Sequence, residues 1–593
     1  MMAFSAQTRR TTIAQLKTTD LDLLIIGGGI TGAGAALQSI ASGAKTGLIE
    51  MGDFGSGTSS RSTKLVHGGI RYLKTFDVKV VADTVQERAR IANVAPHIPH
   101  PAPMLLPIYH EPGATFDLFS AEMAMDLYDR LANIQQGQYA HYMLDREAVL
   151  ARAPNLAEKH LVGGGVYLDY VNNDARLVIE NIKEADELGA MIASHLEVVA
   201  IVHADNGKAI GVKVHDHLTG EEFTIHAKIL LNTTGPWTDQ LRPEVDHPLL
   251  RPTKGVHLVV DDAVLFVPQP IYFDSGLQDG RMIFVIPRAG KTYFGTTDTD
   301  YHGDLAHPTV DFEDVTYLLN VINTRFPEAQ VSLNDIEASW AGLRPLLAPP
   351  TAETHMDLQP LVEIIHQFVA GTATQAQVEA VMSALTKSQA APSTVSRGYE
   401  VLTEPDGMIT IAGGKLTDYR KMAESAITVI RERLLTEHGV HTSQIDSTHL
   451  QVSGGHFDPS TVLDSLDYFA RLAEDAGIPR TQAHRLAQRF GSNIGRVLHY
   501  TQAGAAPGLS LGETASLRYS VQEEMTLTPV DYMLRRTNAI LFHAHTAENI
   551  AGPVVAEMAR LLEWDDLETE AQLQRLLNAM HESALTTMKR DHQ

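Results

Sequence analysis

The chain has no cysteine among its 593 residues, which excludes disulfide bonds, thiolate metal sites and thiol nucleophiles. It also lacks the run of about 18 apolar residues that a membrane-spanning helix needs. Residues 1–20 contain no apolar core of signal-peptide length. We therefore expect a cytoplasmic protein with no stable membrane insertion.

Positive charge is scarce as well. The chain has 47 Lys and Arg residues against 72 Asp and Glu residues, for a formal net charge of -25. This balance argues against nucleic acid and anionic membranes as main partners, but it allows a local cationic pocket. With 44% hydrophobic and 20% charged residues, the composition is typical of a globular protein that holds more than one domain.

A glycine-rich motif, GGGITG, stands at residues 27–32 directly after an apolar run. This order predicts a strand, a tight turn and a helix, in which Gly27 permits the turn, Gly29 lets the backbone approach a pyrophosphate, and Gly32 lets the helix pack on the strand. Glu50 ends the next apolar segment, at the position where an acid binds ribose hydroxyls. The motif therefore predicts a dinucleotide site.

The segment 57–73, GTSSRSTKLVHGGIRYL, is dense in hydroxyls, glycines and cations. A solvated loop would account poorly for His67 and Arg71, which are flanked by glycine and aliphatic residues. Here the sequence resembles the FAD-dependent glycerol-3-phosphate oxidase and dehydrogenase family, and most closely the alpha-glycerophosphate oxidases. The resemblance runs from about Leu21 to the C-terminus.

This resemblance implies an α/β fold. We expect an FAD-binding Rossmann-like domain of the glutathione-reductase and D-amino-acid-oxidase type, an antiparallel-sheet substrate domain and a C-terminal helical domain. The expected boundaries are 1–20 for an N-terminal extension, 21–250 for the FAD-binding domain with chain crossings to the substrate domain, 251–347 for the β-rich substrate domain, 348–393 for a helical insertion, 394–440 for the return to the FAD domain and 441–593 for the C-terminal helices.

Hydrophobic periodicity predicts helices over 78–92, 117–132, 176–188, 314–326 and 418–434. In the second of these, Phe119, Met123, Leu127 and Leu131 are expected on one buried face. Short β-rich segments separated by turn residues between 256 and 297 predict a largely antiparallel sheet. The glycine triplet at 163–165 matches a phosphate loop by pattern, but no apolar strand precedes it, so we discount it.

The resemblance also implies the site. Cofactor contacts are expected from Gly27, Gly28, Gly29, Gly32, Glu50, Thr58, Ser59, Ser60, Lys64, Leu65, His67, Gly68, Val198, Thr234, Gly235, Trp237, Gly414, Lys415, Leu416 and Thr417. Substrate binding is expected from Arg71, Tyr72, Lys254 and Arg344, and catalytic roles from His67, Arg344 and Lys415. Arg420 is a further cation at a motif edge. No metal is expected.

The implied reaction oxidises C2 of glycerol 3-phosphate. It requires hydride transfer to flavin N5 and removal of the 2-hydroxyl proton. His67 is the candidate base because an imidazole pKa of about 6.5 suits proton transfer near neutrality; the alternative is a histidine that only hydrogen-bonds or tethers the flavin. Arg344 and Arg71 are the candidate phosphate ligands, and Lys415 or Lys254 could stabilise the reduced flavin.

The electron acceptor is expected to be O2, with release of H2O2, because the insertion at 348–393 resembles that of the soluble oxidases. The alternative is a quinone-linked, membrane-associated dehydrogenase. A flavin amino-acid oxidase binds a carboxylate, and the match over residues 64–73 argues against it. A non-catalytic flavin scaffold would keep the glycine loop but would need neither His67 nor Arg344. The C-terminal helices could instead serve assembly, so a homo-oligomer is possible.

Overall fold

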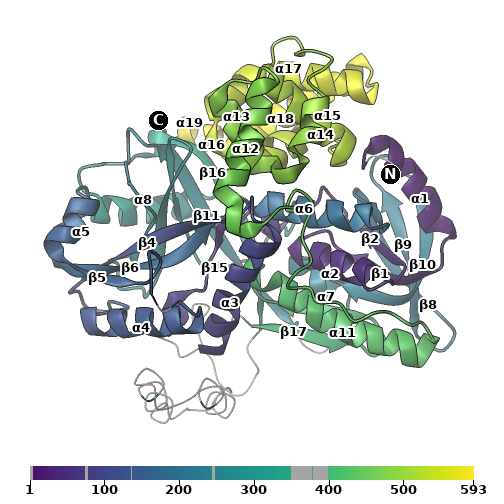
Figure 1. Ribbon diagram of the computed structural model, residues 1–593, viewed down its shortest axis with the longest axis horizontal. Coiled ribbons are helices and arrows are strands. Elements are labelled where there is room, and N and C mark those ends of the chain that lie inside the picture. Colours follow the sequence, from purple (N-terminus) through teal and green to yellow (C-terminus); the bar gives the residue numbers. More distant parts are fainter. Residues whose placement is uncertain are drawn as a thin grey trace.

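The computed structural model describes residues 4–73, 78–134, 136–243, 248–348, 367, 377 and 398–592. Within them, two β-sheets form two lobes, and the C-terminal helices lie across the junction between the lobes (Figure 1). The predicted insertion at 348–393 falls almost entirely outside the described residues.

The first sheet has the parallel core that the glycine motif predicts. Its strands follow the order β17 (Tyr399–Thr403), β18 (Ile409–Gly413), β10 (Glu222–Asn232), β1 (Leu21–Ile26), β2 (Thr46–Ile49) and β7 (Met191–Ala193). From β18 to β7 all neighbours are parallel, whereas β17 pairs antiparallel with β18. Every residue of β1 is buried, as expected of a central strand covered on both faces.

Different elements cover the two faces of this sheet. Helices α2 (Ile30–Ala41), α6 (Asp174–Glu187) and α11 (Tyr419–His438) share one apolar core with Leu23 and Ile25 of β1. Helix α1 (Ala6–Thr18) and the hairpin of β8 (Leu196–His203) and β9 (Ala209–Asp216) share the other core with Leu24.

The second sheet is antiparallel except for the pair β12–β4, so the predicted pattern is confirmed. Its order is β15 (Thr299–Asp300), β11 (Leu250–Asp261), β14 (Lys291–Gly295), β13 (Met282–Arg288), β12 (Ile271–Asp274), β4 (His100–Tyr109), β6 (Leu161–Val171) and β3 (Leu65–Val66). Strand β16 (Ile336–Leu347) pairs with β11, and β5 (Tyr142–Asp145) pairs with β6. Two separate stretches of chain, 65–171 and 250–347, therefore build this sheet.

Local predictions agree with the structure over most of the chain. The expected helices appear as α3 (Val78–Val94), α4 (Leu118–Leu131), α6, α8 (Phe312–Arg325) and α11. The glycine triplet 163–165 lies inside β6, where a Cβ on Gly164 would come within 2.7 Å of the Leu106 carbonyl oxygen, so these glycines permit close strand packing. The face predicted for α4 is wrong at Phe119, which is 70% exposed; Met125 and Tyr128 are buried instead.

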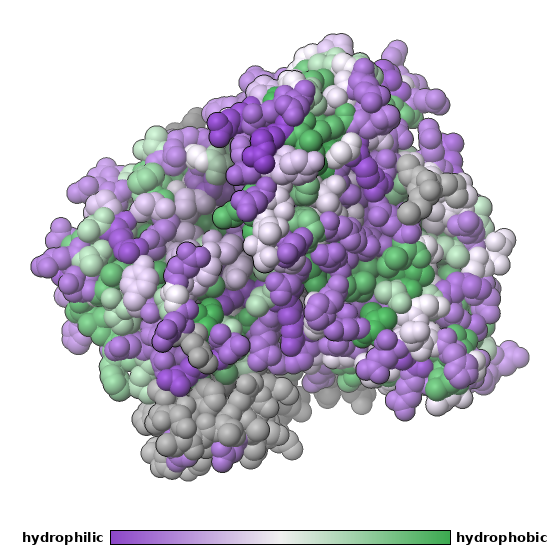
Figure 2. All heavy atoms as spheres, in the orientation of Figure 1, coloured by the Kyte–Doolittle hydropathy of each residue, from purple (hydrophilic) through white to green (hydrophobic). Residues whose placement is uncertain are grey.

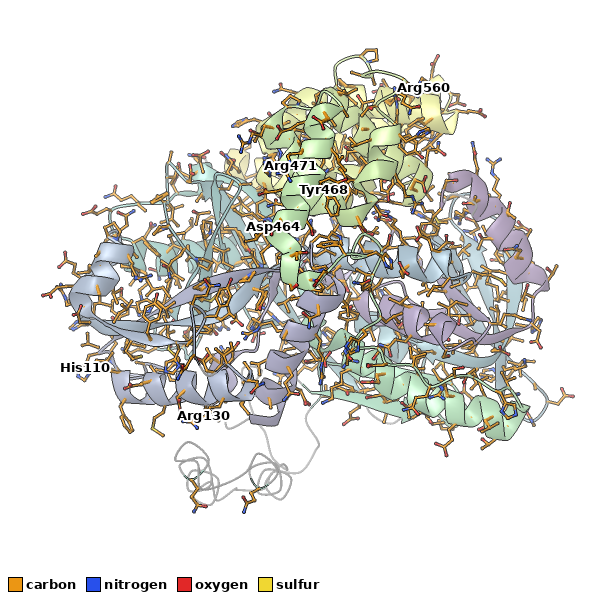
Figure 3. The ribbon with its side chains drawn as sticks, in the orientation of Figure 1. His110, Arg130, Asp464, Tyr468, Arg471 and Arg560 are labelled. Carbon is orange, nitrogen blue, oxygen red and sulfur yellow. The ribbon has the colours of Figure 1, made fainter. Side chains whose placement is uncertain are left out.

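The C-terminal part is helical, as the resemblance implied. It comprises α12 (Val462–Asp475), α13 (Arg480–Phe490), α14 (Ile494–His499), α15 (Leu511–Glu523), the π-helical turn η9 (Asp531–Arg536), α16 (Ala539–Phe542), α17 (Ala544–Leu562), α18 (Asp566–Ser583) and α19 (Thr586–Asp591). Asp464, Tyr468 and Arg471 lie along α12 in Figure 3, and all three are exposed.

On the face shown in Figure 2, hydrophilic and hydrophobic residues are interspersed over the two lobes and the C-terminal helices. Among the described residues, no helix has both the length and the apolar character needed to cross a membrane.

Candidate active site

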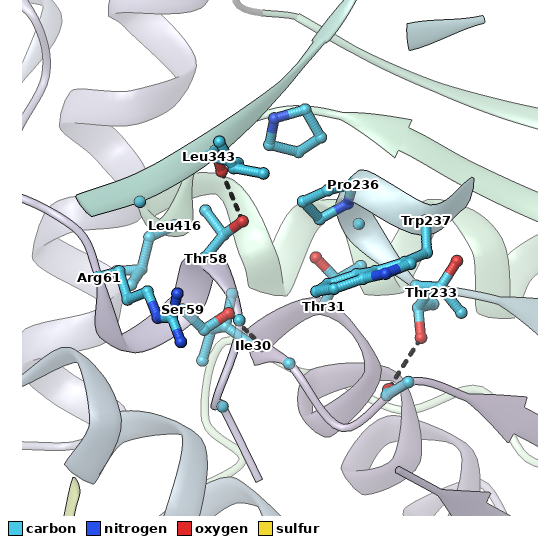
Figure 4. Close-up of a pocket in the computed structure, with 18 of the residues that line it drawn as sticks. Ile30, Thr31, Thr58, Ser59, Arg61, Thr233, Pro236, Trp237, Leu343 and Leu416 are labelled. Atoms are coloured by element: carbon cyan, nitrogen blue, oxygen red, sulfur yellow. Dashed lines mark hydrogen bonds between the residues drawn. The ribbon is translucent and has the colours of Figure 1, made fainter. Parts of the chain in front are cut away.

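A cavity of about 440 Å³ lies between the two sheets. Much of its wall comes from five segments that are far apart in sequence: the turn between β1 and α2, the loop 55–63, the turn 233–237 after β10, strand β16 and the turn 413–417 after β18 (Figure 4). Three of these segments follow the carboxyl ends of neighbouring parallel strands, where doubly wound sheets bind their ligands.

The glycine turn has the close backbone packing that its sequence predicts. Gly27 adopts a φ of +107°, and a Cβ on Gly32 would lie 1.9 Å from the Gly27 carbonyl oxygen. Gly29 caps the N-terminus of α2 and lines the cavity. The N-terminus of α2, which is the positive end of its dipole, therefore lies at the cavity, as a site for a pyrophosphate requires.

Glu50 follows β2 and lies against this turn. Its carboxylate accepts hydrogen bonds from the backbone N–H groups of Gly28 (2.6 Å) and Gly52 (2.8 Å). Burial raises the pKa of Glu50, while these two bonds oppose the rise. The side chain lines the cavity, as a ligand of ribose hydroxyls should.

The loop 58–63 is held in place by the second sheet. Thr58 donates to the Leu343 carbonyl oxygen at 2.6 Å, and the Trp340 indole donates to the Ser62 carbonyl oxygen at 3.0 Å. On the other side, the hydroxyl of Ser59 accepts from the backbone N–H of Ile30 at 2.9 Å (Figure 4). This loop therefore joins β16 to the N-terminus of α2.

His67 lies in the cavity wall just after β3. The following residue, Gly68, donates its N–H to the Tyr128 hydroxyl (2.8 Å) and to Asp169 (3.2 Å), while Arg88 binds Asp169 at 2.9 Å. A Cβ on Gly68 would lie 2.5 Å from the Tyr128 oxygen. A buried polar network thus fixes the backbone that presents the His67 imidazole.

Arg344 reaches the cavity from β16. Its guanidinium donates to the hydroxyl of Thr296 (2.8 Å) and pairs with Asp298 (3.2 Å), and 23% of the side chain remains exposed. A Cβ on Gly255 would lie 2.3 Å from this guanidinium, so the glycine provides the space that the side chain occupies.

The turn after β18 brings Lys415, Leu416 and Thr417 to the cavity. The Thr417 hydroxyl donates to the His67 carbonyl oxygen at 3.3 Å, which ties this turn to the histidine segment. Asp418 follows and is 5% exposed. Burial raises the pKa of Asp418 to about 7, against the opposing charge of Lys415.

Most of the predicted cofactor residues therefore meet at one cavity. Those that line it are Gly27, Gly29, Glu50, Thr58, Ser59, Leu65, His67, Val198, Thr234, Gly235, Trp237, Gly414, Lys415, Leu416 and Thr417. Gly28, Gly32, Ser60 and Gly68 are not in the wall, but each lies next in sequence to a residue that is.

Three of the predicted cations are placed elsewhere. Lys254 pairs with Asp311 (2.5 Å) and Asp314 (2.6 Å), because alternation along β11 directs it away from Gly255. Lys64 is fully buried and bonds Asp174 at 2.9 Å, and Arg420 bonds Glu87 at 2.7 Å. The geometry therefore does not support substrate binding by Lys254 or direct cofactor contact by Lys64.

The structure does not place the two remaining predicted substrate ligands, Arg71 and Tyr72, in the cavity wall. Arg71 lies in the short helix η2 (Ile70–Leu73), is partly buried and is not among the residues that line the cavity. The side chain of Tyr72 lies outside the described part of the chain.

Sequence reasoning missed His257 and Thr63, which also line the cavity. The imidazole of His257 stacks on Trp340 at 4.9 Å and shares a 3.0 Å hydrogen bond with the Thr63 hydroxyl. Burial, with the charge of Arg344 next, lowers the pKa of His257 well below its usual range. The available signal was its spacing of two residues from Gly255, which places both on the cavity side of β11.

Comparison with known proteins identifies the class that this fold and cavity define. The family described as FAD dependent oxidoreductase matches residues 22–364, and the C-terminal domain of alpha-glycerophosphate oxidase matches residues 445–569. The protein is therefore an FAD-dependent oxidoreductase, and the predicted cofactor is confirmed.

Individual relatives narrow the class. The alpha-glycerophosphate oxidase of Enterococcus casseliflavus is 53% identical over 99% of both chains, and that of Lactococcus lactis subsp. lactis is 50% identical over 99% of this chain and 100% of its own. A solved glycerol-3-phosphate dehydrogenase from Bacillus halodurans, complexed with FAD, is 35% identical with a TM-score of 0.78 and 98% coverage of both chains. The chain belongs to the alpha-glycerophosphate oxidase family, as the sequence predicted.

Proposed function

We propose that the protein oxidises sn-glycerol 3-phosphate to dihydroxyacetone phosphate and passes the electrons to O2, which yields H2O2. The main support is the 53% identity, over 99% of both chains, to an alpha-glycerophosphate oxidase. The cavity agrees with this chemistry, because it joins a dinucleotide cradle to a cationic and imidazole-bearing wall.

Arg344 is the candidate ligand of the substrate phosphate. Its guanidinium lies in the cavity wall and is partly exposed, and the planar fork of an arginine suits bidentate contacts to phosphate oxygens. Asp298 and Thr296 fix its orientation. Lys415, in the turn after β18, adds positive charge to the same cavity.

His67 is the candidate base for the 2-hydroxyl proton. When bound, FAD would supply the hydride acceptor for C2 and the electrons that reduce oxygen. The imidazole must then hold the proton released from the hydroxyl, a role that histidine side chains commonly fill as general bases. The hydrogen bonds from the Gly68 N–H to Tyr128 and Asp169 fix the backbone next to His67.

O2 is the proposed acceptor rather than a quinone. The relatives that are 49–53% identical are named oxidases, whereas the dehydrogenase from Bacillus halodurans is 35% identical. The same proposal includes a cytoplasmic location, small-molecule partners only, and a possible homo-oligomer whose size gel filtration at several concentrations would measure.

Anaerobic stopped flow tests the proposal. Mixing the oxidised enzyme with glycerol 3-phosphate should bleach the flavin absorption, and subsequent mixing with aerated buffer should restore it rapidly with one H2O2 per flavin. Failure of the first step would reject the substrate. Slow recovery with O2 but fast recovery with a quinone analogue would make the protein a dehydrogenase.

A further inference from the structure

Asp53 lies in the loop that follows Glu50 and is only 3% exposed. Its carboxylate does not face the cavity residues; it binds two arginines of the C-terminal helices. Arg536 donates to both carboxylate oxygens, at 2.7 and 2.8 Å, and Arg535 donates through Nε. Although burial would raise the pKa of Asp53, the charges of Arg536 and Arg535 lower it, so the carboxyl is ionised at working pH.

Both arginines belong to η9, a single π-helical turn, an irregularity that is frequent at functional sites. Arg536 is fully buried and Arg535 is 7% exposed. Arg536 also donates to the carbonyl oxygen of Glu524, whose side chain binds Arg176 of α6 at 2.7 Å. Buried charges thus join the C-terminal helical region to the lobe of the first sheet at two places, the Asp53 loop and helix α6.

The other side of the Asp53 loop forms part of the cofactor cavity. Met51, Gly55 and Ser56 line the cavity, and the Gly55 N–H donates to the Gly28 carbonyl oxygen at 3.0 Å. The ring of Phe54 lies where a Cβ on Gly28 would approach it to 2.9 Å. The two residues that follow Asp53 therefore lie directly against the glycine turn.

We infer that Asp53 is a positioning residue through which the C-terminal helical domain sets the affinity for FAD. Arg535 and Arg536 hold the loop 51–56 in the shape that completes the cradle around Glu50 and Gly28. The proposed oxidase activity does not require this coupling, and the coupling would stand with a different substrate or electron acceptor. It rests only on FAD binding at the cavity.

Coupling of this kind is reciprocal: if η9 strengthens FAD binding, then bound FAD must stabilise η9 by the same factor. A purely structural role predicts something different, since Asp53 would then support the fold equally with and without FAD. Two measurements separate these cases, namely FAD affinity and the response of η9 to FAD.

The test compares Asp53→Asn with Glu557→Gln, each in the full chain. Glu557 is a matched control because it is 5% exposed and also binds two arginines, Arg518 at 2.6 Å and Arg560 at 2.7 Å, but entirely within the C-terminal helices (Arg560 in Figure 3). Fluorescence titration of the FAD-free proteins should give a Kd raised about 5- to 150-fold for Asp53→Asn, the usual range of coupling between sites. Glu557→Gln should leave the Kd unchanged.

Hydrogen exchange gives the second readout. In the parent protein, FAD should slow exchange of the backbone amides of 531–537 by a larger factor than it slows exchange of those in α17. In Asp53→Asn, exchange at 531–537 should be the same without FAD and at saturating FAD, apart from any change shared with α17. Glycerol 3-phosphate should still reduce the bound flavin of this variant within a few-fold of the parent rate. An unchanged Kd for Asp53→Asn, or exchange at 531–537 that is insensitive to FAD in the parent, would overturn the inference.

Discussion

At the scale of single residues, His67 is the group with the clearest expected effect on chemistry. His67→Ala should retain FAD, because the cradle at Gly27–Gly32 is untouched, but flavin reduction by substrate should slow by about 10²–10⁴-fold, as loss of a general base usually does. Anaerobic stopped flow measures this rate. Reduction at the parent rate would place the base elsewhere, with His257 as the next imidazole in the wall.

Arg344 and Lys254 form an informative pair, since both were predicted substrate ligands and only Arg344 lines the cavity. Arg344→Met should raise KM and weaken competitive phosphate esters by about 10- to 100-fold, the loss expected for charge-assisted hydrogen bonds. Lys254→Met should leave KM unchanged, because its ammonium pairs with Asp311 and Asp314. Equal effects of the two substitutions would contradict this placement.

Asp418 should make stability depend on pH. Its carboxyl is raised from an ordinary pKa of 3.8 to about 7, so between these values the native state binds more protons than the unfolded chain. Stability from this group therefore falls as pH rises through that window. Asp418→Asn should be more stable than the parent at pH 8 but not at pH 4, as measured by thermal unfolding; a difference independent of pH would refute the shift.

How far the sequence predicts the site depends on the kind of residue. The glycine turn and Glu50 could be placed because local backbone rules fix them. Lys254 could not, because motif membership does not tell which face of β11 a side chain takes. Lys64 resembles a cavity cation in sequence, but its partner Asp174 is 110 positions away in the chain.

At the scale of elements, the turn between β1 and α2 should tolerate no side chain at Gly32. The Cβ of Gly32→Ala would lie 1.9 Å from a backbone oxygen, so α2 must move away from β1. We expect loss of bound FAD after purification, measured by the flavin absorbance per chain. Gly552→Ala in α17 is the control: nothing lies within 4 Å of its Cβ, and Ala favours a helix. Equal FAD content in both variants would contradict the argument.

Helices could be predicted because their apolar spacing is a local feature of the sequence. The place of a strand in a sheet was harder to predict, because its partner strand can be far away in sequence. The helices α3, α6, α8 and α11 follow from their apolar spacing. The residues of β3 to β6 do not by themselves predict that these strands belong to the second sheet. Sheet membership depends on partner strands such as β12, which pairs with β4 and lies more than a hundred residues later. The exposed Phe119 shows the same limit for a helix face.

At the scale of the whole molecule, the cofactor cavity is a shared boundary. Both sheets contribute to its wall. The C-terminal helices bind the loop after β2 through Arg536, and they bind β16 of the second sheet through the carbonyl oxygen of Ser583, which accepts from the Ser339 hydroxyl at 2.8 Å. A ligand in this cavity should therefore stabilise the three parts together.

Thermal unfolding at several FAD concentrations measures this linkage. Because FAD binds only the folded chain, an excess of 100 times Kd should add about 2.7 kcal/mol to the free energy of unfolding, and the midpoint should rise with the logarithm of free FAD. The buried ion pairs at the domain junction predict one transition in both forms. If FAD raised the midpoint of only one of two separate transitions, the C-terminal helices would unfold independently of the cavity. That result would contradict the claim that FAD stabilises both sheets and the C-terminal helices together.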